Sequence, residues 1–259
     1  MTGQPHNLDG KVAIVTGGGG AIGAATAMRL ARAGAAVAIA DIDEDAAAGV
    51  ATKLKAEGFA AEPFAVDLSN EEEISALVAR ILKSFGRVDI LHNNAVANSD
   101  EILKADLTLL ELKTEIWDKI FAVNVRAAML LSRYSIPHML RQGTGGAIVN
   151  TSSGASELVS VDARTAYGPS KAALEALTRY IAAQYGARNI RCNAILPGAV
   201  LTPGMQKLFG AEQLRRMQRR TMTQRLCLPE DIAATVHFLV SEDARQITGQ
   251  LIRVDGGRL

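Results

Sequence analysis

A tyrosine and a lysine stand four positions apart in the segment Tyr167-Gly168-Pro169-Ser170-Lys171. Four residues make about one turn of a helix, so on a helix the two side chains share a face. A lysine ammonium beside a tyrosine favours the phenolate, which can then exchange protons with a substrate near neutral pH. The pair therefore predicts a general acid/base, although the same spacing also arises by chance as an exposed surface pair.

A second chemical signal lies near the start of the chain, in the consecutive glycines from Gly17 to Gly20. The apolar run 11–16 precedes them and predicts a buried parallel strand. Small and apolar residues with helical periodicity follow, up to a stop signal at Gly34. Strand, glycine turn and helix together form the context of a dinucleotide fingerprint, in which backbone N–H groups and the helix N-terminus hold a pyrophosphate.

The next apolar run, 36–40, ends at Asp41. Dinucleotide-binding folds place an acidic residue about 20 residues after the glycines, where it binds the adenosine ribose hydroxyls and repels a 2′-phosphate. No arginine or lysine lies between Thr16 and Gly23 or directly after Asp41, so we expect NAD rather than NADP. The alternative is that Asp41 only begins a loop and caps the next helix, whose first turn is acidic.

The whole chain of 259 residues has the length of one α/β domain, and we expect a single domain over 1–259. Strand-like and helical segments alternate to the end without an internal repeat. The predicted strands are 11–16, 36–41, 61–66, 88–92, 147–150, 190–196 and 250–254. This pattern predicts a Rossmann-type, doubly wound parallel sheet of about seven strands with helices on both faces.

Composition excludes several other classes of protein. The net charge of +1 and a pI near 7.8 give no bias toward nucleic acid or membrane surfaces. No apolar run approaches the length of a membrane span, and the polar start is no signal peptide. The two cysteines, Cys192 and Cys227, therefore predict no disulfide and a cytoplasmic setting, with Cys192 as a core residue. The four histidines lack metal-ligand spacing, so we expect no metal.

With these signals in place, the chain resembles the short-chain dehydrogenase/reductase family in its compact branch, nearly from end to end. Thr16, Gly17 and Gly23 match the family's glycine motif, and Ala21 stands where the family has its middle glycine. The resemblance implies that the cofactor contacts the turn and the start of the helix. These contacts are Gly17, Gly20, Ala21, Ile22, Gly23 and the ribose carboxylate of Asp41.

The resemblance implies further cofactor contacts along the chain. They are Asp67, Leu68, Asn94, Ala95, Pro197, Gly198, Val200 and Thr202, together with Tyr167 and Lys171. In the family the first of these hydrogen-bonds near the adenine ring. The backbone at Val200 and the hydroxyl of Thr202 match the positions that hold the nicotinamide carboxamide. Val96 stands where the family has a glycine in the turn after the fourth strand.

Four positions match the catalytic set of the family: Asn124, Ser153, Tyr167 and Lys171. Asn124 matches the asparagine that holds a water linking the lysine to solvent, and its alternative role is a structural hydrogen bond to the backbone. Ser153 matches the serine that holds the substrate oxygen. The segment between it and Tyr167 is one residue longer than in much of the family, so Ser152 stays open as the alternative.

The resemblance implies an oxidoreductase that transfers a hydride between NAD and a small-molecule secondary alcohol or ketone, assembled as a homotetramer through its last strand. NAD preference favours oxidation, although the sequence does not fix the direction. One alternative is an NADPH-dependent carbonyl reductase of the 3-oxoacyl type, and another is a catalytically silent dinucleotide-binding protein. Enoyl reductases of the same fold space the tyrosine and lysine more widely, so they are disfavoured.

Residues 203–228 lie where the family carries its substrate lid. This segment contains Lys207, Arg215, Arg216, Arg219, Arg220 and Arg225 against the single acid Glu212. Leu214, Met217 and Leu208 can form an apolar stripe, which leaves the arginines on a solvated face or against a neighbouring subunit. The side facing the site would then be apolar, built from Met205, Leu208, Phe209 and Met222, and suited to a hydrophobic substrate. The alternative is an anionic substrate recruited by the arginines.

Overall fold

The computed structural model describes residues 7–157 and 164–257. Its strands form one seven-stranded, all-parallel sheet in the order β3-β2-β1-β4-β5-β6-β7. The strands are β1 Val12–Thr16, β2 Ala36–Asp41, β3 Ala61–Ala65, β4 Ile90–Asn93, β5 Gly146–Thr151, β6 Ile190–Pro197 and β7 Leu251–Val254. Each overlaps a predicted strand, so the prediction of a Rossmann-type parallel sheet is confirmed.

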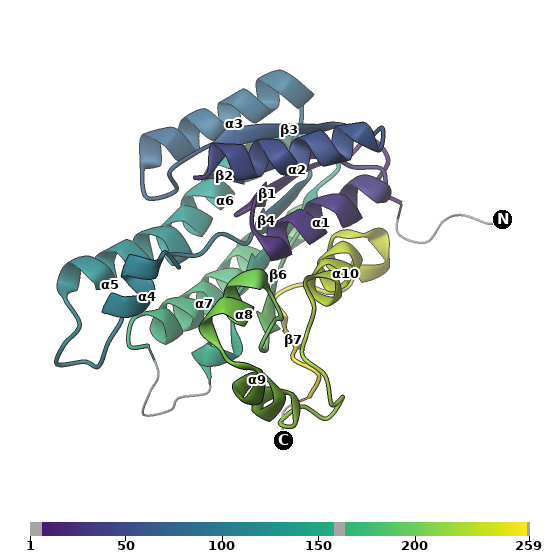
Figure 1. Cartoon of the computed structure of the whole chain (residues 1–259). Coiled ribbons are helices and arrows are strands. Elements are labelled where there is room, and N and C mark those ends of the chain that lie inside the picture. The colour runs from purple at the N-terminus through teal and green to yellow at the C-terminus, as the bar shows by residue number, and fades with distance from the viewer. Residues whose placement is uncertain (1–6, 158–163, 258–259) are drawn as a thin grey trace.

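Two layers of helices cover the sheet (Figure 1). The larger helices are α1 Ala21–Arg32, α2 Glu44–Ala56, α3 Glu71–Phe85, α6 Ala127–Gln142, α7 Tyr167–Tyr185 and α10 Pro229–Val240. Buried side chains of α1, α2 and α10 share one core cluster with the strands, and those of α3, α6 and α7 share the other. In the described part of the chain, no helix is long and apolar enough to cross a membrane.

Burial on both faces explains the composition of the strands. Every residue of β1 is buried, and its neighbour β2 is buried over Val37–Ala40, which is why these strands are continuous apolar runs without alternation. The outermost strand β3 carries Pro63, whose missing N–H is tolerated at an edge. The sheet therefore has a rigid, buried centre at β1 and β4, where the strand order reverses.

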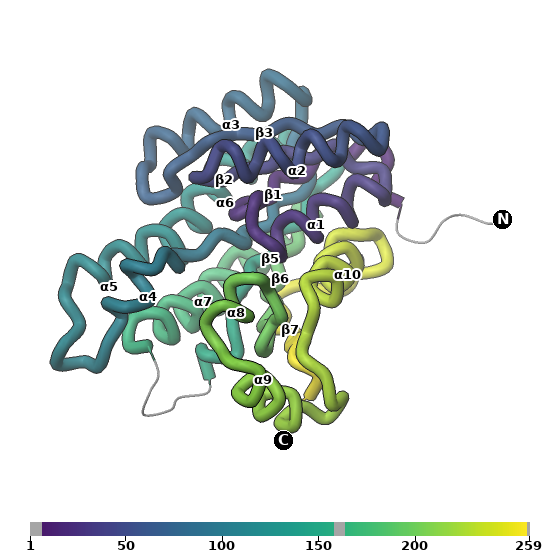
Figure 2. The backbone as a smooth tube through the Cα atoms, viewed as in Figure 1, coloured from purple at the N-terminus to yellow at the C-terminus, as the bar shows by residue number. Residues whose placement is uncertain are grey.

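The shorter helices lie on the chain segments that leave the carboxyl ends of the strands. They are α4 Asp100–Ala105, α5 Thr114–Phe121, α8 Pro203–Leu208 and α9 Ala211–Gln218. In the view of Figure 2, α4 and α5 lie on one side of α7, and α8 and α9 lie on the other. Ligands of such open parallel sheets bind outside the carboxyl ends, at the point where the strand order reverses.

Candidate active site

The glycine turn after β1 is built so that only glycine fits at its tightest points. Gly17 has φ of +60°, in the left-handed region, and a Cβ at Gly23 would lie 2.1 Å from the Gly17 carbonyl oxygen. Helix α1 follows Gly20, with no side-chain cap hydrogen bond and no acidic residue in its first turn. Its first N–H groups therefore remain available to an anion such as a pyrophosphate.

Asp41 ends β2 and lies directly beside this glycine turn. Its Oδ2 accepts a hydrogen bond of 2.9 Å from the Gly19 N–H, and its Oδ1 accepts one of 3.1 Å from the Asp43 N–H. Helix α2 is capped by Asp43, whose Oδ1 accepts from the Ala46 N–H at 2.9 Å. The alternative in which Asp41 caps that helix is therefore wrong, because the cap lies two residues later.

The loop after β4 is fastened to the end of β1. Thr16 Oγ1 accepts hydrogen bonds from the N–H groups of Asn94 at 3.0 Å and Ala95 at 3.1 Å. The Asn94 side-chain amide donates to the carbonyl oxygens of Thr16 and Gly17 at 3.1 and 3.3 Å. These contacts place Asn94 and Ala95 against the glycine turn, at the reversal point of the sheet.

The two residues expected near the adenine ring, Asp67 and Leu68, follow β3. Asp67 Oδ1 accepts from the Ser69 N–H at 2.8 Å, and the Asp67 N–H donates to Glu73 at 2.8 Å. Leu68 is buried among the apolar residues beneath this turn. The turn is therefore fixed by its own hydrogen bonds, with the Asp67 carboxylate half-exposed at its surface.

The segment after β6 is held to two other parts of the chain. The Gly198 N–H donates to the Val254 carbonyl at 3.0 Å, and the backbone at Val200 pairs with Cys227 as an isolated bridge. The hydroxyl of Thr202 accepts from the Met205 N–H at 3.1 Å and so caps α8. Pro197 ends β6, and the chain that follows it passes directly into the helices of the 203–228 segment.

The tyrosine and lysine meet at the beginning of α7, whose first residue is Tyr167. Lys171 is only 2% exposed, and its Nζ donates to the Thr151 carbonyl at 2.8 Å. The same Nζ lies 5.7 Å from the centre of the Tyr167 ring. Burial, with a smaller contribution from the charge of Arg164, lowers the pKa of Lys171 to about 7.

Arg164 was not predicted from the sequence. Its side chain contacts the Tyr167 ring, as that of Lys171 does. Its guanidinium carbon is 4.2 Å from the centre of the Tyr167 ring, a cation–π distance. Two cations therefore contact one phenol ring. A single arginine in a loop carries no sequence signal for such a contact, since nothing in the pattern fixes the direction of its side chain.

The two candidate serines have different surroundings. Ser152 is buried, and its hydroxyl donates to Glu175 at 2.6 Å and to the Lys171 carbonyl at 3.2 Å. Ser153 is half-buried, and its Oγ accepts from the Ala155 N–H at 3.2 Å. Ser152 is thus committed to α7. The extra residue expected between Ser153 and Tyr167 falls in a segment that includes 158–163, outside the described residues.

Asn124 lies in a π-helical turn, Ala122–Arg126, between α5 and α6. Its Oδ1 accepts from the Ala97 N–H at 2.9 Å, so the backbone hydrogen bond weighed as the alternative role is present. Its Nδ2 donates to Ser170 Oγ at 2.9 Å, and that hydroxyl donates to the Tyr167 carbonyl at 2.7 Å. Single π-helical turns occur often at functional sites, and this one directs a buried amide toward the tyrosine helix.

Asp106, directly after α4, is a second residue that sequence reasoning missed. Its buried carboxylate accepts hydrogen bonds from the backbone N–H groups of Ala166 at 2.8 Å and Tyr167 at 3.0 Å. The contact joins positions 60 and 61 residues apart in the chain. An isolated aspartate that belongs to no motif gives no sign of such a partner.

The 203–228 segment keeps its basic side chains in solvent. Glu212 lies 3.0 Å from both Arg215 and Arg219, and Arg225 pairs with Asp231 at 2.6 Å. In α9, Leu214 and Met217 are half-buried while the arginines are exposed, as the predicted apolar stripe requires. Of the four expected site-facing residues, Met205 and Phe209 are half-buried, whereas Leu208 and Met222 are 59% and 62% exposed.

The cysteines and the possible metal ligands add nothing to this site. Cys192 is fully buried in β6, as predicted for a core residue, and burial raises the pKa of its thiol far above the usual value. Burial also raises the pKa of Cys227 to about 11, so neither thiol is poised as a nucleophile. Across residues 7–157 and 164–257, no three His, Cys, Asp or Glu residues are grouped so that they could hold a metal ion.

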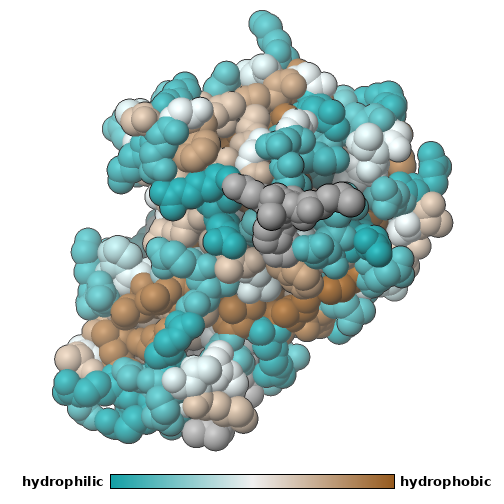
Figure 3. Space-filling view, turned by 90° about the vertical axis from the view of Figure 1, so that its right-hand side faces the viewer, coloured by the Kyte–Doolittle hydropathy of each residue, from teal (hydrophilic) through white to brown (hydrophobic). Residues whose placement is uncertain are grey.

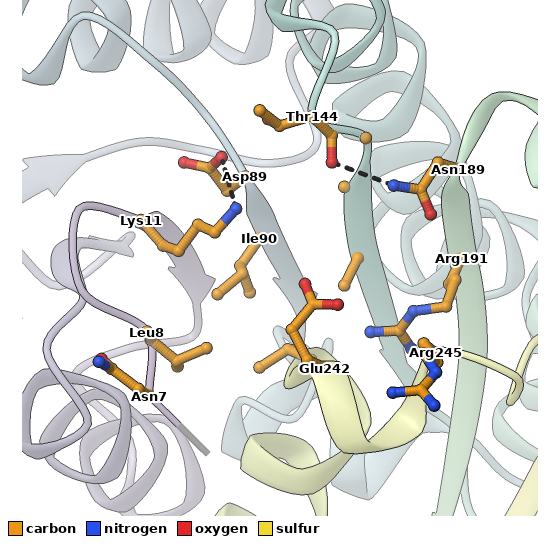
Figure 4. Close-up of a pocket in the computed structure, with 14 residues that line it drawn as sticks. Asn7, Leu8, Lys11, Asp89, Ile90, Thr144, Asn189, Arg191, Glu242 and Arg245 are labelled. Carbon is orange, nitrogen blue, oxygen red and sulfur yellow. Dashed lines mark hydrogen bonds and ion pairs between the residues drawn. The ribbon is translucent and has the colours of Figure 1, made fainter. Parts of the chain in front are cut away.

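A separate pocket lies at the amino ends of the strands β4, β5 and β6, on the side of the sheet opposite to the carboxyl ends (Figure 4). Its lining includes Lys11, Asp89, Thr144, Asn189, Arg191, Glu242 and Arg245. Figure 4 shows Lys11 reaching toward Asp89, and the two form an ion pair of 3.8 Å. None of the residues predicted for catalysis or cofactor binding lines this pocket.

Comparison with known proteins agrees with this arrangement. The family described as enoyl-(acyl carrier protein) reductase matches residues 19–258. A probable short-chain type dehydrogenase/reductase of Bradyrhizobium diazoefficiens is 41% identical, with the match covering 97% of this chain and 88% of that protein. A 7alpha-hydroxysteroid dehydrogenase of Bacteroides fragilis is 38% identical over 97% of this chain and 95% of its own.

Among solved structures, a 7alpha-hydroxysteroid dehydrogenase complexed with NADH and 7-oxo glycochenodeoxycholic acid superimposes with a TM-score of 0.91. It is 35% identical, and the match covers 98% of this chain and 96% of that one. These matches show that the chain belongs to the short-chain dehydrogenase/reductase family. It is an oxidoreductase that acts on hydroxyl or keto groups, with the dinucleotide cofactor typical of that family.

Proposed function

We propose that the protein is an NAD(H)-dependent dehydrogenase of secondary alcohols, or the corresponding ketoreductase, with Tyr167 as its general acid/base. The observation that carries the proposal is the buried Lys171 ammonium 5.7 Å from the Tyr167 ring, at the carboxyl edge of the sheet. The glycine turn fits a dinucleotide, because its helix begins without a side-chain cap and a Cβ at Gly23 would close the turn.

The chain's own residues account for the proton steps of this reaction. Tyr167 removes the hydroxyl proton of the alcohol, and the charge of Lys171 favours the phenolate that accepts it. The Thr151 carbonyl, 2.8 Å from Nζ, directs that ammonium. Bound nicotinamide supplies the acceptor for the hydride of the carbinol carbon. In the reverse direction Tyr167 donates a proton to the carbonyl oxygen.

Ser153 and Asn124 take supporting roles in the proposal. The hydroxyl of Ser153 holds the substrate oxygen, and the commitment of Ser152 to Glu175 at 2.6 Å favours Ser153 over its neighbour. Asn124 fixes the tyrosine helix through Ser170 and completes a proton relay from Lys171 toward solvent. Since Asn124 also accepts from the Ala97 N–H, its structural and catalytic roles coexist.

The carboxylate of Asp41 favours NAD over NADP in this site. It lies within hydrogen-bond distance of the glycine turn, at Gly19, where the ribose of a bound dinucleotide would approach. A 2′-phosphate there would meet a negative charge. The related 7alpha-hydroxysteroid dehydrogenase structure contains NADH, which supports the same preference.

For the substrate, we propose a hydrophobic secondary alcohol or ketone of roughly steroid size. Two relatives named 7alpha-hydroxysteroid dehydrogenase support this class. The half-buried Met205 and Phe209 place apolar surface on the segment that we propose as the lid, residues 203–228. The exposed arginines of that segment would then face solvent rather than substrate.

The test is a panel of substrates with each cofactor, followed by the absorbance of the reduced nicotinamide. We expect turnover of hydroxysteroids or other hydrophobic secondary alcohols with NAD and much weaker turnover with NADP. An enoyl thioester with NADH and NADPH serves as the control that the family description calls for. Turnover of the enoyl thioester alone, or no turnover of any alcohol or ketone, would contradict the proposal.

We also propose that the protein assembles as a homotetramer, as the resemblance implied. Apolar side chains remain exposed on two long helices, with Tyr180 of α7 68% exposed and Met129 of α6 37% exposed. The edge strand β7 is only half-buried. On the face of the molecule drawn in Figure 3, apolar side chains form a band across the lower part of the picture. Light scattering after size-exclusion chromatography tests the assembly, and a monomeric mass would contradict it.

A further inference from the structure

Asp106 stands out among the buried charged groups because, within the described residues, its side chain hydrogen-bonds only to the beginning of the tyrosine helix. Its side chain is 4% exposed, and its two carboxylate oxygens accept from two successive backbone N–H groups, those of Ala166 and Tyr167. No ion pair of Asp106 occurs among the described residues. The buried carboxylate is therefore balanced by peptide N–H groups at the beginning of a helix rather than by a cation.

These two N–H groups lie at the beginning of α7, where backbone N–H groups have no intrahelical acceptor. The first N–H groups of a helix have no intrahelical acceptor, and a side chain at the N-cap position usually supplies one. The N-cap residue of α7 is Ala166, which has no side chain able to do so. Asp106 accepts instead from the N–H groups of the N-cap residue itself and of the first helical residue, from a segment that lies 60 residues earlier in the chain, and its charge suits the positive end of the helix.

The position of this cap matters because Tyr167 is the first residue of α7. Terminal turns of helices fray more readily than their interiors. In this helix the Tyr167 N–H is held by Asp106 at 3.0 Å, and the Tyr167 carbonyl is held by Ser170 Oγ at 2.7 Å. The peptide groups on both sides of the tyrosine are therefore fixed by side chains, which limits the directions its phenol can take.

We propose that Asp106 is a positioning residue that holds Tyr167 in its reactive orientation and joins the α4 segment to the proton-transfer step. The inference rests on the proposed role of Tyr167. A purely structural role would instead make Asp106 one more buried group that stabilises the fold, with no selective effect on turnover. Both roles require that Asp106 hold the amides of Ala166 and Tyr167, and they differ in what they predict for kcat.

A first measurement needs no variant and no substrate. Hydrogen exchange of the wild-type protein, read at the amides of Ala166 and Tyr167, reports whether Asp106 holds them. We expect both to exchange at least about tenfold more slowly than uncapped first-turn amides, as a hydrogen bond to a charged acceptor implies. Exchange as fast as in an uncapped helix end would overturn the proposal, whatever the activity of the enzyme.

The second measurement compares Asp106→Asn with Asp89→Asn. The asparagine at 106 can accept from one N–H but turns an NH2 group toward the other. Asp89 is a matched control, because it is equally buried and accepts from the Val12 N–H at 2.9 Å, but it lies at the amino edge of the sheet. For Asp106→Asn we expect faster exchange at 166 and 167, a kcat about 10–100-fold lower, and an unchanged Kd for NADH.

For Asp89→Asn we expect a lower Tm with an unchanged kcat. Asp106→Glu, which keeps the charge but displaces the oxygens, should recover part of the lost kcat. A kcat of Asp106→Asn within about twofold of the wild type would overturn the proposal, and so would an equal loss of kcat in Asp89→Asn. If the wild type turns over no alcohol or ketone, the proposed function fails while the exchange measurements still decide whether Asp106 holds the tyrosine helix.

Discussion

The two edges of the sheet treat their buried polar groups differently. At the amino edge, the Asp89 carboxylate is paired with Arg87 at 2.6 Å and accepts from the Val12 N–H, and Arg191 donates to the carbonyls of Leu239 and Ser241. At the carboxyl edge, the buried Lys171 ammonium donates to the Thr151 carbonyl and contacts the Tyr167 ring, and it forms no ion pair within the described residues.

Two buried side-chain atoms near the carboxyl end of β4 have no hydrogen-bond partner within the described residues. They are the Nδ1 of His92 and the Oδ1 of Asn93. Thr26 Oγ1 in α1 and Ser135 Oγ in α6 are in the same state, and such buried groups usually bind an ordered water or a ligand. We therefore expect the polar groups at the amino ends of the strands to stabilise the fold and those at the carboxyl ends to take part in the reaction.

Tyr167→Phe should give the largest effect. The substitution removes the proton acceptor but hardly changes the volume of the side chain, so we expect kcat to fall by at least about 100-fold. NADH binding, followed by its fluorescence, and Tm should stay near the wild-type values. Retention of more than about a tenth of the wild-type turnover would remove Tyr167 from the mechanism.

Asp41→Ala should change the choice of cofactor. Without the carboxylate, NAD loses its ribose contact and NADP no longer meets a negative charge, so the ratio of kcat/KM for NAD to that for NADP should fall about 10–100-fold. Asp43→Ala is the matched control, because Asp43 caps α2 two residues later. If the ratio changes equally in both variants, or in neither, Asp41 does not read the ribose.

The burial of His92 should make the stability of the fold fall at acidic pH. Burial lowers the pKa of His92 to about 3, whereas the unfolded chain has the ordinary value of 6.5. Between these values the unfolded state binds a proton that the folded state does not, so stability falls as pH falls from 6.5 toward 3. The slope from this group approaches about 1.4 kcal/mol per pH unit. We expect His92→Gln to flatten the dependence of Tm on pH below 6.5, and an equal slope in both proteins would contradict it.

The arginines of residues 203–228 should have the smallest effect, because Arg215, Arg219 and Arg225 are already paired. For a hydrophobic substrate we expect the KM to be nearly indifferent to salt. A several-fold rise of the KM with salt, abolished by Arg216→Gln together with Arg220→Gln, would show that the lid reads an anionic group. Substrate binding would then involve residues of the 203–228 segment as well as those at the carboxyl ends of the strands.

The parts of this fold that sequence could predict are those written in local patterns. The alternation of strand-like and helical segments predicted the seven strands, and the glycine turn and the one-turn spacing of Tyr167 and Lys171 predicted the centre of the site. Asp106 and Arg164 could not be predicted, because each acts through a contact that depends on the path of a loop. The π-helical turn at Asn124 was also hidden, since its residues have ordinary helical composition.

We propose that the protein binds an alcohol so that its carbinol carbon gives a hydride to nicotinamide while Tyr167 takes the hydroxyl proton. The most direct test of this proposal uses an alcohol from the substrate panel that carries deuterium on the carbinol carbon, with mass spectrometry of the reduced cofactor. We predict that the deuterium is recovered in NADH made by the wild type and by Asp89→Asn, and that Tyr167→Phe forms almost no labelled NADH. Deuterium released to water, or labelled NADH formed equally fast by Tyr167→Phe, would contradict the account.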